Sequence, residues 1–288
     1  MKIGIYYNYF IPGRFVRFGE ERFQKLKSFG YDALDYSLSN TDQFPYTGAQ
    51  NEVTAFLKKE KNMIADAGLE ISQVHGPWRW PARDQHEEDR AERMEKMKRS
   101  LYMTAELGCV NWVIHPVMPD GIHERDTSLA EKTWQINLEL MGQLLEEAKK
   151  LGITICFENM PMPQFSIATP ADIMRFVRAM DDDAFQVCLD TGHVAVCKEI
   201  SAGDAVRFMG DSIKVFHIHD SRIGQDLHLM PFFGDIDWVD FGKALKDIRY
   251  EGVFSLETVP PASLPTELFE QSTILLNRYA RQIISYME

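Results

Sequence analysis

The chain has 288 residues, of which 45% are hydrophobic and 26% are charged, so it can bury a sizeable core and extensive disorder is excluded. Its formal net charge of −12 would repel a polyanion, which argues against nucleic acid as a partner and favours a small molecule. The four cysteines show no CxxC spacing, which predicts buried thiols and excludes a simple thiolate metal site.

The amino terminus predicts the first strand. Residues 2–8, KIGIYYN, contain alternating β-forming residues. The first ten residues contain no long apolar stretch of the kind that an export signal or a membrane span needs. We therefore expect a cytoplasmic protein without membrane contact.

A helical pattern that ends in glycine, followed by a short β-rich run, recurs along the chain. Glycine readily adopts the left-handed conformation just past a helix C-terminus, so each instance predicts a helix-to-strand turn. The six instances are Gly30 before YDALDY, Gly68 before LEISQVH, Gly108 before CVNWVIH, Gly152 before ITICFE, Gly210 before DSIKVFHIH and Gly252 before VFSLE.

The run FQVCLD completes a set of eight predicted strands. Thr169 and Ser201 are predicted N-caps, and a last helix over about 265–286 should pack beside the first strand. Further helices are expected over about 20–29, 91–107, 134–151 and 241–249. An open doubly wound sheet would show a Gly-rich phosphate loop after the first strand, and none is present. We predict a single (β/α)8 TIM barrel over residues 1–288.

All eight histidines fall at a predicted strand end or in the loop after one, and none falls inside a predicted helix. The carboxyl ends of the strands form the face on which such barrels build their active sites. A carboxylate that ends an apolar run, as in ITICFE, faces a desolvation cost that a cation relieves. Imidazoles mixed with carboxylates suit zinc, manganese or a related ion. The residues are His75, His115, Glu158, Asp190, His193, His217, His219, Asp226, His228 and Glu257.

With these residues in place, the sequence resembles the xylose isomerase-like TIM-barrel superfamily over nearly its whole length. The superfamily includes D-tagatose 3-epimerase, inosose isomerases and dehydratases, and endonuclease IV. In its sugar enzymes one metal ion is held by a Glu, an Asp, a His and a Glu from strands five to eight. The resemblance gives these roles to Glu158, Asp190, His217 and Glu257. His219 shares the predicted strand face of His217, but HIHD matches His-x-x-Asp when His217 is the ligand.

The resemblance implies a divalent-metal-dependent isomerase or epimerase of a sugar or polyol, with Mn, Zn, Co or Mg as cofactor. The ion would acidify a C–H group next to a carbonyl and stabilise the enediolate. Glu158 and Glu257 would act as acid and base on opposite faces of the substrate. The same enediolate can expel a leaving group, so a lyase or dehydratase acting on a sugar or inosose derivative is the alternative.

Endonuclease IV binds three zinc ions, and the resemblance extends to its additional ligands. They match His75, His115, His193, Asp226 and His228, which together with His219 are candidates for substrate contacts or for a second metal. Because the acidic chain would repel DNA phosphates, an abasic-site endonuclease is the less favoured hypothesis.

Three residues are weaker candidates for substrate binding. Trp78 and Trp80 could stack on a sugar face or could simply pack the loop between prolines. Arg222 could meet a phosphate or carboxylate or could be solvated. The chain has no Gly-rich phosphate cradle, which favours an unphosphorylated substrate. The sequence is also compatible with an oligomer.

Overall fold

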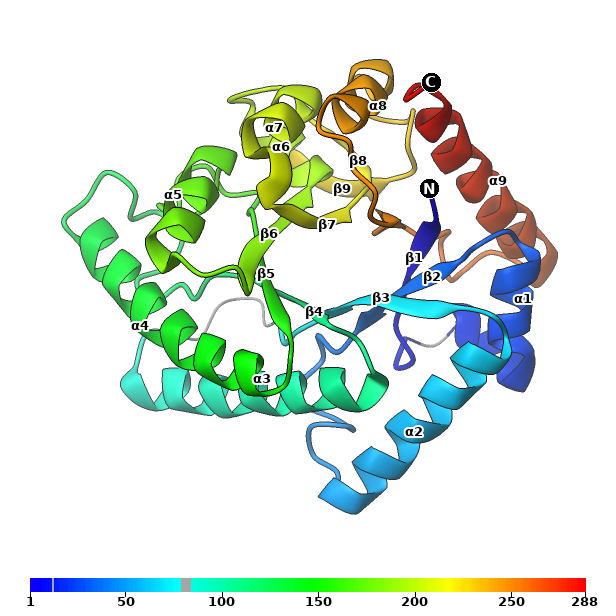
Figure 1. The fold of residues 1–288 in the computed structure, drawn as a ribbon, viewed down its shortest axis with the longest axis horizontal. Helices are drawn as coiled ribbons and strands as arrows, with labels where there is room; N and C mark the ends of the chain where they lie inside the picture. The colour runs from blue at the N-terminus through cyan, green and yellow to red at the C-terminus, as the bar shows by residue number, and fades with distance from the viewer. Residues whose placement is uncertain (12, 79–83) are drawn as a thin grey trace.

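Eight parallel strands form one sheet in the order β10-β1-β2-β3-β4-β5-β6-β7 (Figure 1). The computed structural model describes residues 1–11, 13–78 and 84–288. The sheet closes where Ile218 N donates to Ser255 O at 2.8 Å and Glu257 N donates to Ile218 O at 3.0 Å. The predicted barrel is therefore confirmed. The strands are β1 Ile3–Tyr7, β2 Ala33–Ser37, β3 Glu70–His75, β4 Asn111–Ile114, β5 Thr154–Glu158, β6 Phe185–Asp190, β7 Ile213–His217 and β10 Phe254–Leu256.

Helices surround the ring of strands (Figure 1). A small antiparallel hairpin of β8 (Asp220–Arg222) and β9 (Gln225–Leu229) lies between β7 and α8 in the chain. The helices are η1 Phe15–Glu21, α1 Arg22–Ser28, α2 Gln50–Asp66, α3 Glu87–Leu107, α4 Leu129–Lys150, α5 Pro170–Met180, α6 Thr191–Cys197, α7 Ala202–Met209, η2 Gly210–Ser212, α8 Trp238–Asp247 and α9 Thr266–Ser285. No described helix is long and apolar enough to cross a membrane.

The predicted helix boundaries are largely confirmed. Thr169 caps α5 in a reciprocal capping box with Asp172, and Ser201 accepts from Asp204 N at the start of α7. Five of the six turn glycines have positive φ. Gly252 does not, so that prediction was wrong: α8 ends earlier, and Arg249 takes the left-handed conformation instead, with φ of 54°.

The expectation that no histidine lies in a helix was wrong for His193. The short helix α6 begins directly after β6, and His193 lies in it. The reading of the cysteines is confirmed, since all four are free and buried.

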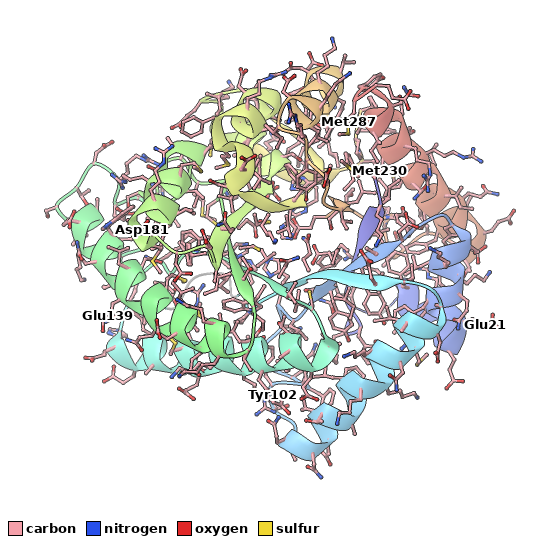
Figure 2. The ribbon with its side chains drawn as sticks, in the orientation of Figure 1. Glu21, Tyr102, Glu139, Asp181, Met230 and Met287 are labelled. Carbon is pink, nitrogen blue, oxygen red and sulfur yellow. The ribbon has the colours of Figure 1, made fainter. Side chains whose placement is uncertain are left out.

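Side chains alternate between the two faces of each strand, and this alternation directs the polar residues at the strand ends into the barrel interior. Phe157 of β5 faces outward and stacks on Phe176 of α5, with ring centroids 4.7 Å apart, so its neighbours Cys156 and Glu158 face inward. The next two strands, β6 and β7, repeat this pattern of inward-facing residues, with Cys188 before Asp190 and Val215 before His217. Side chains fill the interior of the ring, whereas Glu21 and Glu139 lie at its outer rim (Figure 2). Each of these three strands therefore ends with a polar side chain above an apolar layer.

Candidate metal centre

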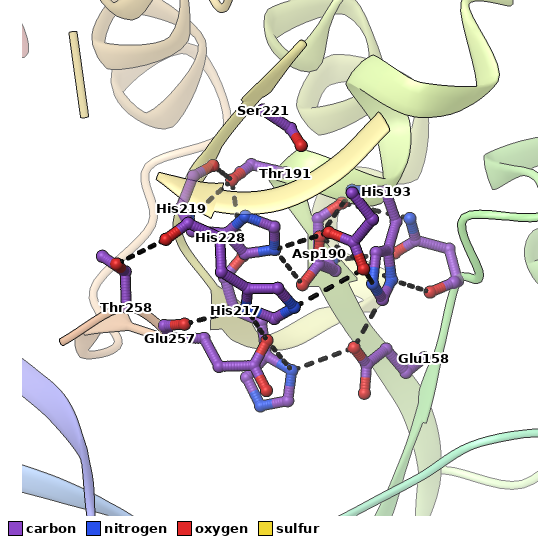
Figure 3. A network of polar contacts seen from close by, with 12 residues as sticks. Glu158, Asp190, Thr191, His193, His217, His219, Ser221, His228, Glu257 and Thr258 are labelled. Carbon is purple, nitrogen blue, oxygen red and sulfur yellow. Dashed lines mark hydrogen bonds and ion pairs between the residues drawn. The ribbon is translucent and has the colours of Figure 1, made fainter. Parts of the chain in front are cut away.

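Four polar side chains converge at the carboxyl ends of β5, β6, β7 and β10 (Figure 3). Each offers one ligand atom, and these atoms all lie within 4.8 Å of one another. Three of the side chains are at most 1% exposed and that of Glu257 is 11% exposed, so the charges are held away from water. We call Glu158, Asp190, His217 and Glu257 the strand-end cluster.

Glu158 is the most heavily contacted member of this cluster. His217 Nδ1 lies 3.0 Å from Glu158 Oε1, and His115 Nε2 lies 2.9 Å from Glu158 Oε2. Burial alone would raise the pKa of Glu158, but the neighbouring His217 and His115 hold it well below its usual range. Glu158 is therefore held as a carboxylate, the form that binds a cation.

Glu257 has a different environment. Burial raises the pKa of its carboxyl above the usual range, although His217 and His228 oppose the shift. Glu257 Oε2 makes no hydrogen bond to any described residue despite its burial. The two glutamates of the strand-end cluster are thus pushed toward opposite protonation states, an arrangement suited to an acid–base pair.

Asp35 is a residue that the sequence interpretation missed. It lies fully buried on β2, and its Oδ2 is 3.0 Å from His217 Nε2. A carboxylate on the far nitrogen of an imidazole fixes the ring orientation and leaves the other nitrogen for a metal. The signal was available, because Asp35 stands in the apolar run YDALDY as Glu158 stands in ITICFE.

A second group lies beside the strand-end cluster and comes from loops and short elements. His193 is on α6, His219 follows β7, and Asp226 and His228 are on β9. Their ligand atoms also lie within 4.8 Å of one another. We call His193, His219, Asp226 and His228 the loop cluster. Figure 3 labels its three histidines.

Neighbouring carboxylates raise the pKa of two histidines in the loop cluster. Although burial favours a neutral ring, Asp190 and Asp226 raise the pKa of His193 to about 10. Burial also favours the neutral ring of His228, but Asp226 and Glu257 raise its pKa to about 9. Without a metal, the described residues therefore hold both imidazoles as cations at neutral pH.

Asp190 joins the two clusters. Its Oδ1 accepts from His193 N at 2.6 Å, which caps α6, and its Oδ2 lies 3.0 Å from His219 Nε2. Gly192 makes room for this arrangement, because a Cβ there would lie 1.9 Å from His219 Cε1. His217 therefore belongs to the strand-end cluster and His219 to the loop cluster, although both come from the segment HIHD.

The hairpin that carries Asp226 and His228 is anchored at two places. Asp220 is buried and accepts hydrogen bonds from Phe232 N and Trp238 Nε1. His228 has a φ of 45°, and Thr258 Oγ1 donates to its carbonyl at 2.7 Å. A non-glycine residue in the left-handed region is strained, and such strain is found mainly at functional sites.

A third group shares Glu158 with the strand-end cluster. His75, at the end of β3, and His115, just after β4, could hold an ion together with Glu158. Burial lowers the pKa of His115 to about 4, so this ring is neutral and able to act as a ligand.

The clusters face a cavity of about 530 Å³, which we call the main cavity. Trp78 lines it and packs edge-on against His115, with ring centroids 4.3 Å apart. Tyr6 also lines it and was not anticipated. Arg222 is exposed on β8 and is not among the lining residues. Trp80 lies outside the described residues.

The donor set fits a divalent first-row metal. The strand-end cluster provides three carboxylates and one imidazole with no thiolate among its four members, a composition that suits zinc, manganese or cobalt. The buried Glu257 oxygen without a hydrogen bond among described residues would gain a partner from a cation. The described geometry therefore accommodates an ion at this cluster.

Comparisons with known proteins agree with this fold. A family model described as xylose isomerase-like TIM barrel matches residues 23–276. D-psicose 3-epimerase from Agrobacterium fabrum is 26% identical over 263 residues, which cover 89% of this chain and 84% of the relative. The structure of a D-psicose 3-epimerase with D-fructose has a TM-score of 0.73 at 18% identity and covers 99% of each chain.

A second solved structure of the same fold is named for another sugar substrate. It is 3-keto-D-glucoside 4-epimerase from E. coli, with a TM-score of 0.74 at 20% identity. The match covers 96% of this chain and 99% of that one. At such identity these two structures establish a shared fold.

Proposed function

Since the chain belongs to the xylose isomerase-like TIM barrel family, we propose that it is a divalent-metal-dependent epimerase or isomerase of a sugar. The observation that carries the proposal is the strand-end cluster, whose four ligand atoms lie within 4.8 Å of one another at the end of the barrel where active sites occur. The D-psicose 3-epimerase relatives support the choice of a sugar as substrate.

When bound, a divalent ion would polarise a substrate carbonyl and make the adjacent C–H group more acidic. Glu158 and Glu257 approach the site from β5 and β10, which β6 and β7 separate in the ring. One carboxylate can remove the proton from that carbon on one face, and the other can return a proton on the opposite face. The configuration of the carbon is then inverted. His193, which lines the same cavity, can donate a hydrogen bond to a substrate oxygen.

The test combines metal analysis with a substrate screen in D2O. Purified protein should contain close to one tightly bound Mn, Zn, Co or Mg ion, and it should epimerise at least one sugar of a panel that holds D-psicose, D-fructose, D-tagatose, the inososes and 3-keto-D-glucosides. Because the carboxylates exchange protons with solvent between turnovers, deuterium should appear on the inverted carbon.

Three other outcomes of this test would change the assignment. A dehydrated product would assign the lyase alternative. Product without carbon-bound deuterium would reject the two-carboxylate mechanism, whereas a protein without metal that a chelator leaves unaffected would reject the metal-dependent function itself.

A further inference from the structure

The active-site region continues into a second cavity, which we call the side cavity. It has a volume of about 690 Å³, larger than the main cavity. Tyr6, His228 and Glu257 line both cavities, so they stand between the two. A molecule bound at the strand-end cluster therefore has room to extend past Glu257.

The lining of the side cavity differs from that of the clusters. Beyond the three shared residues it is mostly apolar, and two of its side chains, Leu227 and Phe233, are 40% and 55% exposed. Large apolar side chains left exposed beside a polar site commonly mark a binding surface. The apolar lining includes Ile11, Leu227, Leu229, Met230, Phe233 and Val259.

Among the described residues that line the side cavity, Arg14 is the one with a permanent positive charge. The Arg14 guanidinium lies over the ring of Tyr6, 5.6 Å from its centroid. None of the ion pairs between described residues involves Arg14. A planar guanidinium stacks well on aromatic rings, so Arg14 is suited to contact an aromatic group in an otherwise apolar cavity.

We propose that the side cavity binds an aromatic aglycone, so that the substrate is a glycoside and not a free sugar. A free ketose is hydroxylated along its whole length and would gain less from apolar walls than an aryl group, which would be removed from water there. This inference rests on the proposed epimerase function and specifies its substrate class.

A glycosidic bond has a chemical consequence for the reaction. It blocks the anomeric carbon, so the carbonyl that acidifies the C–H group must lie on another ring carbon. The substrate class is therefore an oxidised aryl glycoside, and the reaction that supplies it must be the oxidation of a ring hydroxyl to a ketone.

The test measures binding to the manganese-loaded protein by calorimetry, with methyl and phenyl D-glucopyranosides in both anomers as probes. These glucosides carry no carbonyl and cannot turn over, so the result does not depend on epimerase activity. We expect at least one phenyl glucoside to bind 10-fold or more tightly than its methyl counterpart, which corresponds to about 1.4 kcal/mol.

Substitutions in the side cavity localise the effect. Val259→Trp and Met230→Trp should each fill the side cavity and abolish the phenyl preference, while metal content and methyl glucoside binding stay unchanged. Val239→Trp, at an exposed position of α8, is the matched control and should keep the preference.

Equal binding of the phenyl and methyl probes by a protein that epimerises free ketoses would overturn the aglycone inference and leave the proposed function standing. Phenyl preference in a protein that turns over neither a free ketose nor a keto glycoside would overturn the proposed function and leave aglycone binding in the side cavity standing. A dimer that Val259→Trp dissociates, without phenyl preference in either form, would assign the apolar surface to a second copy of the chain and overturn the inference.

Discussion

The strand-end cluster and the loop cluster use the same carboxylate and imidazole groups but are supported differently. The strand-end residues come from four barrel strands, and their side chains are at most 11% exposed. In the loop cluster, Asp226 and His228 come from a hairpin, with side chains 28% and 44% exposed. Strands in a closed sheet position ligands more rigidly than hairpins do. We therefore expect the strand-end cluster to bind metal permanently and the loop cluster to bind a second ion or substrate reversibly.

The largest effect is expected from Asp190→Ala, because Asp190 contributes to one cluster and contacts the other. Loss of a direct ligand should weaken metal binding by more than the 10–100-fold typical of outer-shell substitutions. Elemental analysis should find the variant without metal, and activity should be lost. Asp190→Ala protein that retains a full complement of metal would show that the strand-end cluster is not the principal site.

Glu257→Gln should separate metal binding from proton transfer. The amide keeps a neutral oxygen for the ion but cannot act as a base, so kcat should fall about 100-fold or more while some metal remains. Steady-state kinetics at equal metal content measures this. Glu267→Gln, on the outer helix α9, is the control and should behave as wild type. Unchanged kcat in Glu257→Gln would assign the acid–base role elsewhere.

Asp35→Asn tests the support of His217 behind the strand-end cluster. The amide removes the charge that faces His217 Nε2, so metal affinity should drop by about 10–100-fold without loss of any ligand. Competition with a chelator gives the affinity, and a thermal melt of the metal-free protein controls for folding. If affinity is unaltered, Asp35 has only a structural role.

Asp226→Ala should spare the strand-end metal and weaken only the loop cluster. We expect metal retention at one tightly bound ion per chain, with a change in KM or in the binding of a second ion of about tenfold or less. Equal metal loss in Asp226→Ala and Asp190→Ala would instead mean that the two clusters form one cooperative polynuclear site. In that case, cleavage of an abasic duplex should be tested.

Metal binding at the loop cluster should also depend on pH. His193 and His228, with pKa values of about 10 and about 9, must lose protons before they can bind a metal. Affinity at the loop cluster should therefore rise between pH 7 and 9, by up to about tenfold per unit for each proton released. Calorimetry in buffers of different ionisation enthalpy counts these protons. A pH-independent affinity would contradict the assignment of His193 and His228 as metal ligands.

The same two shifts affect the stability of the metal-free protein. Both pKa values are raised above the ordinary 6.5, so the folded state holds these protons more tightly than the unfolded chain. The contribution is complete below about pH 6.5 and is lost as the pH rises through 9 to 10. Chemical denaturation of the chelated protein should show this decline, and His228→Gln should reduce it.

The sequence by itself determined the barrel and the residue types at its rim. Strand alternation and glycine-ended helices are local patterns, and a carboxylate that ends an apolar run, such as Glu158, is visible without a structure. The same local reasoning failed at His193, because the short helix α6 depends on the cap that Asp190 provides after β6.

Only the tertiary structure decided which of these residues meet. His217 and His219 are two positions apart, yet hydrogen bonds across the barrel assign them to Glu158 and to Asp190 respectively. Asp35 reaches His217 across the barrel interior from β2. The side cavity, likewise, combines Arg14 from the first loop with Val259 from the last. Such contacts join residues far apart in the chain, and ring closure, which no local pattern encodes, brings them together.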